Sequence, residues 1–236
     1  MNMNLNRLSR PADWPRAVLF DLDGTLVDPV PVLTRSANRL LEEERLEPLA
    51  LNDIRNMAGC GSRALVREAF AARNIALAEP LLSRKADLFF RYYVELMTTH
   101  SVLREGAIEA LSAFAEQGIR IAVVTNKPAS MARRIVKHFG LSEYIGAING
   151  GGSGTALKPA PDMLLQALSD FGVSGKDSLM VGDSPVDVAA AKAVPMVSIA
   201  ICGKYSVHAR HRLDADLIID SLTSLPKAIE QLKGTV

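Results

Sequence analysis

The sequence predicts an α/β protein in which a parallel sheet is covered by helices on both faces, with an all-helical domain inserted after the first strand. After Arg104, short apolar segments alternate with segments of helical periodicity, an order typical of a parallel sheet. Between about residues 30 and 100, only helical patterns occur. We therefore expect a sheet domain of residues 1–28 and 105–236, in which 1–15 form a mobile leader, and a helical domain of residues 29–104.

The first strand is expected at 17–20, where a short apolar run is ended by acidic and glycine residues. The insert then carries apolar residues at helical spacing, beginning with Leu33, Ala37, Leu40 and Leu41. Similar stripes follow at 65–70 and 81–96. Because the insert starts at the carboxyl end of the first strand, where ligands bind in open α/β sheets, its position is that of a lid.

The second half of the chain supplies the remaining elements of the sheet domain. The β-branched and apolar runs predict strands at 119–124, 144–148, 178–181, 197–201 and 216–219. The segments between them predict helices at 108–115, 128–139, 159–171, from 185 onward and at 222–232. The glycine-rich residues 150–154 are expected to form a flexible loop.

The composition excludes several classes of protein. The chain has 236 residues, with 27 Lys and Arg against 26 Asp and Glu, so a strongly basic nucleic-acid binder is not expected. No run of 18 apolar residues predicts a membrane helix, and the polar N-terminus is not a secretory signal. Two cysteines, Cys60 and Cys202, are too few for a disulfide framework or a zinc site. We therefore expect reduced thiols and a cytoplasmic protein.

Two groups of carboxylates directly follow expected strands. Asp21 and Asp23 follow the first strand, and two residues apart on an extended chain they project the same way. Asp183 and Asp187 follow the strand at 178–181. Taken singly, the first pair also fits a surface turn, and Asp183 or Ser184 also fits a helix cap. Together, about three carboxylates at one sheet edge are a donor set suited to Mg²⁺.

Further polar residues lie at the other strand ends. Thr125 and Asn126 follow the strand at 119–124, and Lys158 precedes a helix. A hydroxyl, backbone N–H groups and an ammonium group gathered at one edge could surround a phosphate. Taken singly, Thr125 also fits a cap residue and Lys158 a solvated surface charge.

The four motifs occur in the order Asp21-Leu22-Asp23-Gly24-Thr25, then Thr125, then Lys158, then Gly182-Asp183 with Asp187. In this order, and across about residues 17–232, the chain resembles the haloacid dehalogenase superfamily of phosphohydrolases. The insert resembles that family's C1-type cap. The segments 124–128, 158–161 and 59–61 resemble the phosphoglycolate phosphatase branch, and the resemblance implies a Rossmann-like core.

The resemblance implies a role for each motif residue. Asp21 would be the nucleophile, and Asp23 would be first the general acid and then the general base. Mg²⁺ would be held by the Asp21 and Asp183 carboxylates and the Asp23 carbonyl, while Asp187 would hold a metal-bound water or orient Lys158. The phosphoryl oxygens would be bound by Thr125 and the Asn126 N–H, and Lys158 would add positive charge.

We therefore expect a Mg²⁺-dependent phosphatase of a small phosphorylated metabolite, with 2-phosphoglycolate as the first guess. A phosphosugar mutase or pyrophosphatase of the same superfamily is the alternative. A phospho-acceptor signalling module, which also combines Asp, Mg²⁺, Thr and Lys, is an alternative from another class. The expected state is a monomer or homodimer without nucleic-acid or membrane partners.

In the insert, Arg63 is the candidate for binding a substrate carboxylate. It follows Gly59-Cys60-Gly61, where two glycines permit a tight turn, and it stands near the start of the next helix. The alternative interpretation is a solvated residue in the first turn of that helix.

Overall fold

The computed structural model describes all residues except 1–10, 12, 60, 153, 204–205 and 234–236. Most of the expected leader and Cys60 therefore lie outside the described residues. The chain divides into two compact units, Met1–Leu26 with Arg104–Val236, and Val27–Leu103. These boundaries lie two residues and one residue before the expected ones, because Val27–Asp28 pairs with Val102–Leu103 inside the second unit.

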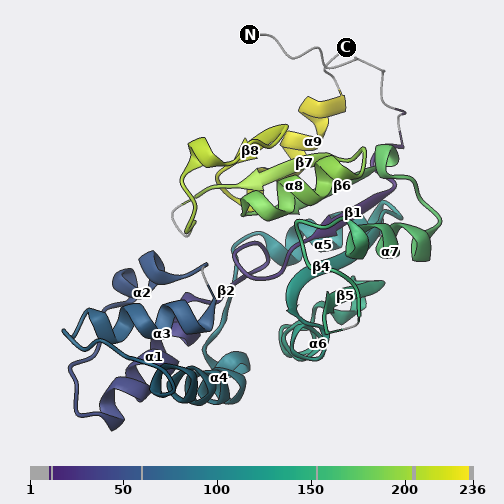
Figure 1. Ribbon diagram of the computed structural model, residues 1–236. Helices are drawn as coiled ribbons and strands as arrows, with labels where there is room; N and C mark the ends of the chain where they lie inside the picture. The colour runs from purple at the N-terminus through teal and green to yellow at the C-terminus, as the bar shows by residue number, and fades with distance from the viewer. Residues whose placement is uncertain (1–10, 12, 60, 153, 204–205, 234–236) are drawn as a thin grey trace. The chain divides into compact units, whose positions relative to one another are not determined.

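The first unit contains a six-stranded sheet in the order β5-β4-β1-β6-β7-β8, with every neighbouring pair parallel (Figure 1). Its strands are β1 (Ala17–Phe20), β4 (Arg120–Pro128), β5 (Ala147–Gly151), β6 (Ser178–Gly182), β7 (Val197–Ile201) and β8 (Leu217–Ile219). Its α-helices are α5 (Ala107–Glu116), α6 (Ala129–His138), α7 (Asp162–Phe171), α8 (Pro185–Ala193) and α9 (Leu225–Lys233). Short 3-10 helices are η1 (Leu141–Glu143), η2 (Gly175–Asp177), η3 (Arg210–Arg212) and η4 (Leu222–Ser224).

Alternating residues of the central strands bury both faces of the sheet. Ala17 and Leu19 of β1 belong to a core cluster with side chains of α7 and α8. On the next residue along, Phe20 faces Phe114 of α5 with 6.2 Å between ring centroids. Successive strand residues point to opposite faces, so α7 and α8 cover one face and α5 covers the other. The predicted fold class, a parallel sheet with helices on both faces, is confirmed.

In the part of the second unit that the structure describes, there are four helices and a short antiparallel ribbon. The ribbon consists of β2 (Val27–Asp28) and β3 (Val102–Leu103), and the helices are α1 (Val30–Glu43), α2 (Leu51–Met57), α3 (Ser62–Ala71) and α4 (Leu81–His100). The stripes of α1, α3 and α4 match those expected, whereas α2 was not predicted. This helix buries only Ile54, so its sequence lacks an apolar stripe. Among the described residues, no helix is both long and apolar enough to cross a membrane.

One prediction for the sheet was wrong in a way that matters for the site. Residues 150 and 151 do not begin a flexible loop but complete β5, where Gly150 pairs with Thr125 and Gly151 with Pro128. Two residues of β4, Asn126 and Lys127, therefore have no partner in the register and form a bulge. The bulge lies near the carboxyl end of β4, so Thr125 and Asn126, expected just after a strand at 119–124, belong to the strand itself.

Candidate active site

The carboxyl ends of three central strands gather the polar motifs at one edge of the sheet. Phe20 of β1 is level with Val123 of β4 and Val181 of β6. The next residue, Asp21, continues this pairing by donating its N–H to the Val181 carbonyl over 2.9 Å. Asp21 and Asp183, which directly follow β1 and β6, therefore lie at nearly the same level as Thr125 within β4, as parallel register requires.

Lys158 is the centre of this cluster. Its side chain is 2% exposed, and its ammonium group donates to Asp21 Oδ1 over 2.8 Å and to Asp187 Oδ1 over 2.6 Å. A third hydrogen bond reaches the carbonyl of Val124 at the end of β4 over 2.7 Å. All three donors of the ammonium group are used, so the position of Lys158 is fixed. The solvated-charge interpretation of Lys158 is therefore wrong.

Asn126 holds the backbone of Lys158. Its side-chain Nδ2 donates to the Lys158 carbonyl over 2.9 Å, and its Oδ1 accepts the Lys158 N–H over 2.8 Å. This reciprocal pair joins the bulge of β4 to the segment before α7. Sequence reasoning considered only the backbone N–H of Asn126 and missed this role of its side chain.

Asp187 connects Lys158 to the start of α8. Its Oδ1 accepts from Lys158, while its Oδ2 accepts from the N–H of Ser184 over 3.0 Å and from the Ser184 hydroxyl over 2.5 Å. Ser184 is the N-cap residue of α8, so of the two candidates for that cap it is Ser184 and not Asp183. Because both Asp187 oxygens are engaged, this carboxylate is arranged to orient Lys158.

Three buried carboxylates, of Asp21, Asp183 and Asp187, offer oxygens that lie within 4.8 Å of one another. Burial raises the pKa of Asp21 to about 6, with Lys158 opposing and Asp187 reinforcing the effect. Burial, and then the charges of Asp21 and Asp187, raise the pKa of Asp183 well above its usual value, while Arg104 and Lys158 oppose this. Burial alone would lower the pKa of Lys158. The negative charges of Asp21 and Asp187 outweigh this effect, so the pKa of Lys158 is raised. With three carboxyl groups around one ammonium group, the cluster has an excess of acidic groups.

This excess fits a divalent cation with oxygen ligands. Asp183 lies directly over Gly24, since a Cβ added there would stand 2.2 Å from Asp183 Oδ2, and Gly24 has a φ of +85°. Glycine at this position therefore lets the carboxylate approach the turn that carries Asp23. Thr25 donates its hydroxyl to Asp183 Oδ1 over 3.5 Å. The donor chemistry suits Mg²⁺ at Asp21, the Asp23 carbonyl and Asp183.

Asp23 is engaged by a lysine that sequence reasoning missed. Lys127 Nζ lies 2.7 Å from Asp23 Oδ2, and the Lys127 N–H donates to Thr125 Oγ1 over 3.3 Å. Thr125 itself is buried. The signal was present in the sequence, because Lys127 stands directly after Asn126 at a strand end.

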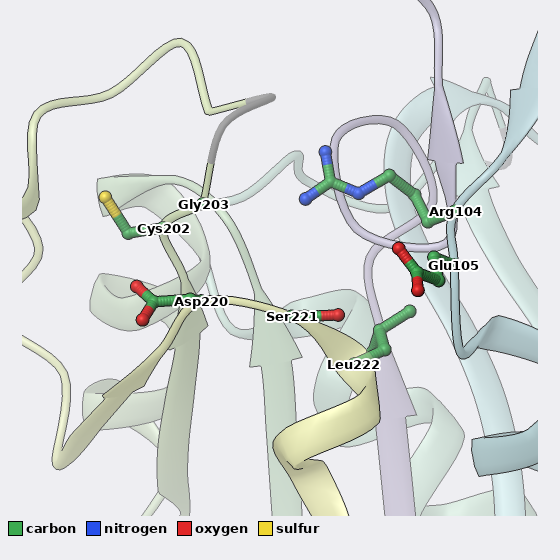
Figure 2. A pocket seen from close by; sticks show the side chains of 7 residues that line it. All are labelled: Arg104, Glu105, Cys202, Gly203, Asp220, Ser221 and Leu222. Atoms are coloured by element: carbon green, nitrogen blue, oxygen red, sulfur yellow. The ribbon is translucent and has the colours of Figure 1, made fainter.

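A cavity of about 500 Å³ opens beyond the carboxyl ends of β7 and β8 (Figure 2). Its lining is Arg104, Glu105, Cys202, Gly203, Asp220, Ser221 and Leu222. Figure 2 shows the Arg104 guanidinium extending across the opening on the side of Gly203. From the sequence, Arg104 was expected only to mark a domain boundary. In the structure, its positive charge opposes the rise in the pKa of Asp183.

Arg63 belongs to the helical unit and not to the unit that holds the cluster. It lies in the first turn of α3, where its guanidinium pairs with Glu79 and donates to the Ser83 hydroxyl over 2.7 Å. Its side chain is 49% exposed. The flanking Gly59 and Gly61 have φ of 97° and 86°, so the expected turn is made by positive-φ glycines.

Comparison with known proteins gives a consistent family. Residues 15–194 match the family model of haloacid dehalogenase-like hydrolases. A phosphoglycolate phosphatase of Rhodospirillum rubrum is 38% identical over 89% of each chain, and one of Agrobacterium fabrum is 34% identical over 94% of each chain. The crystal structure of a predicted phosphoglycolate phosphatase from Haemophilus somnus 129PT superposes with a TM-score of 0.80 at 29% identity, covering 92% of this chain and 99% of that one.

The family match covers all four motifs, and the relatives align with both units. The carboxylates that gather around Lys158 are thus those of the matched region. The chain belongs to the haloacid dehalogenase-like hydrolase family and is one of its phosphatases.

Proposed function

We propose that this phosphatase hydrolyses a small phosphate monoester, 2-phosphoglycolate first among them, through an aspartyl-phosphate on Asp21. The substrate is suggested by the names of the relatives, which are phosphoglycolate phosphatases. The mechanism rests on one observation above all, the Asp21 carboxylate fixed at the end of β1 by Lys158 over 2.8 Å. A nucleophile held in this way loses little orientational freedom on reaction.

In the first half-reaction, a carboxylate oxygen of Asp21 forms a bond to phosphorus while the bond from phosphorus to the leaving oxygen breaks. The leaving oxygen takes the bond electrons and receives a proton from Asp23, so it departs as a hydroxyl group and not as an alkoxide. A pKa of about 6 leaves Asp21 mostly ionised at neutral pH, as a nucleophile must be.

In the second half-reaction, a water oxygen attacks phosphorus and its proton passes to Asp23. The bond from phosphorus to Asp21 breaks, inorganic phosphate leaves, and the Asp21 carboxylate is restored with Asp23 again protonated. Ester and water have then become alcohol and phosphate. The same residue acts as acid and base because the two steps need opposite proton transfers at one place.

The phosphoryl group itself would be held by positive charge and donors from the sheet edge. Thr125 and the Asn126 N–H would bind its oxygens, and the ammonium group of Lys158 would add positive charge beside them. Mg²⁺, held by the Asp21 and Asp183 carboxylates and the Asp23 carbonyl, would neutralise phosphate charge as a Lewis acid. In this proposal Asp187 orients Lys158, consistent with both its oxygens being engaged.

In this proposal, the helical unit selects the leaving group. Arg63 is the candidate partner of a substrate carboxylate, and to act so it would exchange Glu79 for the substrate. We further propose a cytoplasmic monomer or homodimer.

Turnover on a panel of phosphorylated metabolites tests the proposal. We expect continuous phosphate release from 2-phosphoglycolate, exceeding one equivalent per enzyme and surpassing release from sugar phosphates and pyrophosphate. EDTA should abolish it, Mg²⁺ should restore it, and Ca²⁺ should inhibit, because Ca²⁺ accepts more ligands and looser geometry. A single equivalent retained on the protein would instead indicate a phospho-acceptor, and full activity without metal would contradict the metal site.

A further inference from the structure

The ion pair between Lys127 and Asp23 is the part of the site that the motif roles leave unexplained. The two charged groups are 2.7 Å apart, and the Lys127 side chain is only 6% exposed, against 31% for Asp23. A lysine this far buried needs a charged or hydrogen-bonding partner, because removing an ammonium group from water is costly. The Lys127 side chain is therefore a largely buried partner of Asp23, not a surface charge that happens to lie near it.

The backbone that carries Lys127 is shaped to make this contact. Asn126 and Lys127 form the bulge of β4 opposite Gly150 and Gly151. A Cβ on Gly150 would lie 2.8 Å from the Lys127 carbonyl, and a Cβ on Gly151 would lie 2.8 Å from the Asn126 carbonyl. Only glycine at these two positions lets β5 approach the bulge. A bulge re-aims the side chains of its strand. Here the Lys127 side chain reaches Asp23, and the Asn126 side chain bonds the backbone of Lys158.

The two lysines at this edge divide the carboxylates between them. Lys158 holds Asp21 and Asp187, and Lys127 holds Asp23 through Oδ2. The other oxygen, Asp23 Oδ1, is buried and has no hydrogen-bond partner among the residues that the structure describes. A buried acceptor without a partner costs about 1–3 kcal/mol, so the site favours the arrival of a donor there.

We infer that Lys127 is the positioning residue of Asp23: it fixes one carboxylate oxygen so that the other meets the leaving-group oxygen or the attacking water. The inference rests on the proposed function and deepens it. It separates two ways for a lysine to serve a phosphatase. A lysine that binds the phosphoryl group helps every ester alike, whereas one that positions the acid matters in proportion to the leaving group's need for a proton.

The test compares esters with different leaving groups in Lys127→Met, which removes the charge but keeps an unbranched side chain. Glycolate is a basic leaving group that needs protonation, and p-nitrophenolate is a good one that does not. We expect kcat on 2-phosphoglycolate to fall about 30–100-fold and kcat on p-nitrophenyl phosphate to fall less than about fivefold, with KM nearly unchanged on both. Lys127→Arg keeps the charge, so its kcat on 2-phosphoglycolate should be at least about tenfold higher than that of Lys127→Met.

Two further variants make the result specific. In an Asp23→Asn background, adding Lys127→Met should lower kcat on 2-phosphoglycolate by less than about a further threefold, because Lys127 acts through Asp23. Lys192→Met breaks an exposed ion pair with Asp214 in the same unit and should leave both activities unchanged. If Lys127→Met does not fold, as a melting curve would show, Lys127→Gln takes its place as the uncharged variant, and Lys127→Arg remains the variant that keeps the charge.

Equal losses on both esters, a change confined to KM, or no loss would overturn the assignment of Lys127. Failure of the wild-type protein to release phosphate from either ester would instead count against the proposed function. The two failures are therefore distinguished within one set of assays.

Discussion

Two ion-paired cations show how differently the two units are built. Lys158 in the sheet unit is 2% exposed, and its carboxylate partners Asp21 and Asp187 are 11% and 1% exposed. Arg63 in the helical unit and its partner Glu79 are 49% and 51% exposed. A buried charge cannot leave its partners without a large cost, whereas an exposed pair exchanges partners almost freely. In the proposed function, the groups that act on the phosphoryl group are thus fixed by packing, whereas Arg63, the candidate partner of the leaving group, is free to exchange partners.

The strongest test of the fixed half of this comparison is Asp21→Asn. Asn is nearly isosteric but a poor nucleophile, so phosphate release should fall at least about 10³-fold while the fold is kept. Phosphate release alongside a melting curve measures both effects. Activity within about tenfold of wild type, a barrier change of only about 1.4 kcal/mol, would rule out Asp21 as the nucleophile.

Lys158→Met should show that the buried cation serves both stability and activity. Its loss leaves the carboxylates of Asp21 and Asp187 uncompensated, which should destabilise the metal-free protein by about 3–5 kcal/mol. We expect kcat to fall about 10²–10³-fold, the effect of removing one preorganised donor. Denaturant unfolding and steady-state kinetics measure the two losses, and a variant as stable as wild type would show that the cluster does not depend on Lys158.

Arg63→Ala tests the exchangeable half. It should lower kcat/KM for 2-phosphoglycolate about 10–100-fold, hardly affect p-nitrophenyl phosphate, and change stability by less than about 0.5 kcal/mol. Glu79→Ala is the matched control, because it breaks the same ion pair but frees the guanidinium. If Arg63→Ala and Glu79→Ala lose the same activity, the ion pair between these residues only supports the helical unit. Equal losses on both substrates in Arg63→Ala would likewise argue against binding of the substrate carboxylate by Arg63.

The smallest expected effect is the pH dependence of the metal-free protein. The folded-state pKa of Asp21, about 6, is higher than the ordinary value of 3.8, so the folded protein binds the proton more tightly than the unfolded chain. Its contribution is full below about pH 3.8 and is lost as the pH rises through 6. Between pH 5 and 7.5 the metal-free protein should lose about 1 kcal/mol from this group.

Melting curves in EDTA and in Mg²⁺ measure this pH effect. Mg²⁺ should raise Tm more at pH 7.5 than at pH 5, because the cation replaces the missing positive charge only when the carboxylates are ionised. Asp21→Asn should reduce the difference. An equal Mg²⁺ effect at both pH values would mean that the Asp21 cluster does not bind the ion.

The sequence was sufficient to predict the sheet because its strands are short apolar runs separated by regular helices. β1 and β7 lie at their expected residues, 17–20 and 197–201. The bulge of β4 could not be predicted, because it depends on how Gly150 and Gly151 approach a strand some 25 residues away in the chain. The contact of Lys127 with Asp23 depends on that bulge, so it could not be predicted either.

The motif residues show the same division between local and distant information. Asp21 and Asp183 directly follow strands, Asp187 lies in the first turn of α8, and Lys158 stands shortly before α7, and that spacing is visible in the sequence. The partners of individual atoms are not visible there. Only the folded chain provides the side-chain geometry by which both Asp187 oxygens accept hydrogen bonds and by which Asn126 bonds the backbone of Lys158. The pairing of Arg63 with Glu79 is of the same kind.

The most direct test of the account is to trap the covalent intermediate. A reaction with 2-phosphoglycolate, quenched in acid within the first turnover, should leave one phosphoryl group on the peptide that carries Asp21, as peptide mass spectrometry would show. The group should be absent from Asp21→Asn and should accumulate in Asp23→Asn, which lacks the base for the second step. A phosphoryl group on another residue, or steady turnover with none bound in either protein, would contradict Asp21 as the nucleophile.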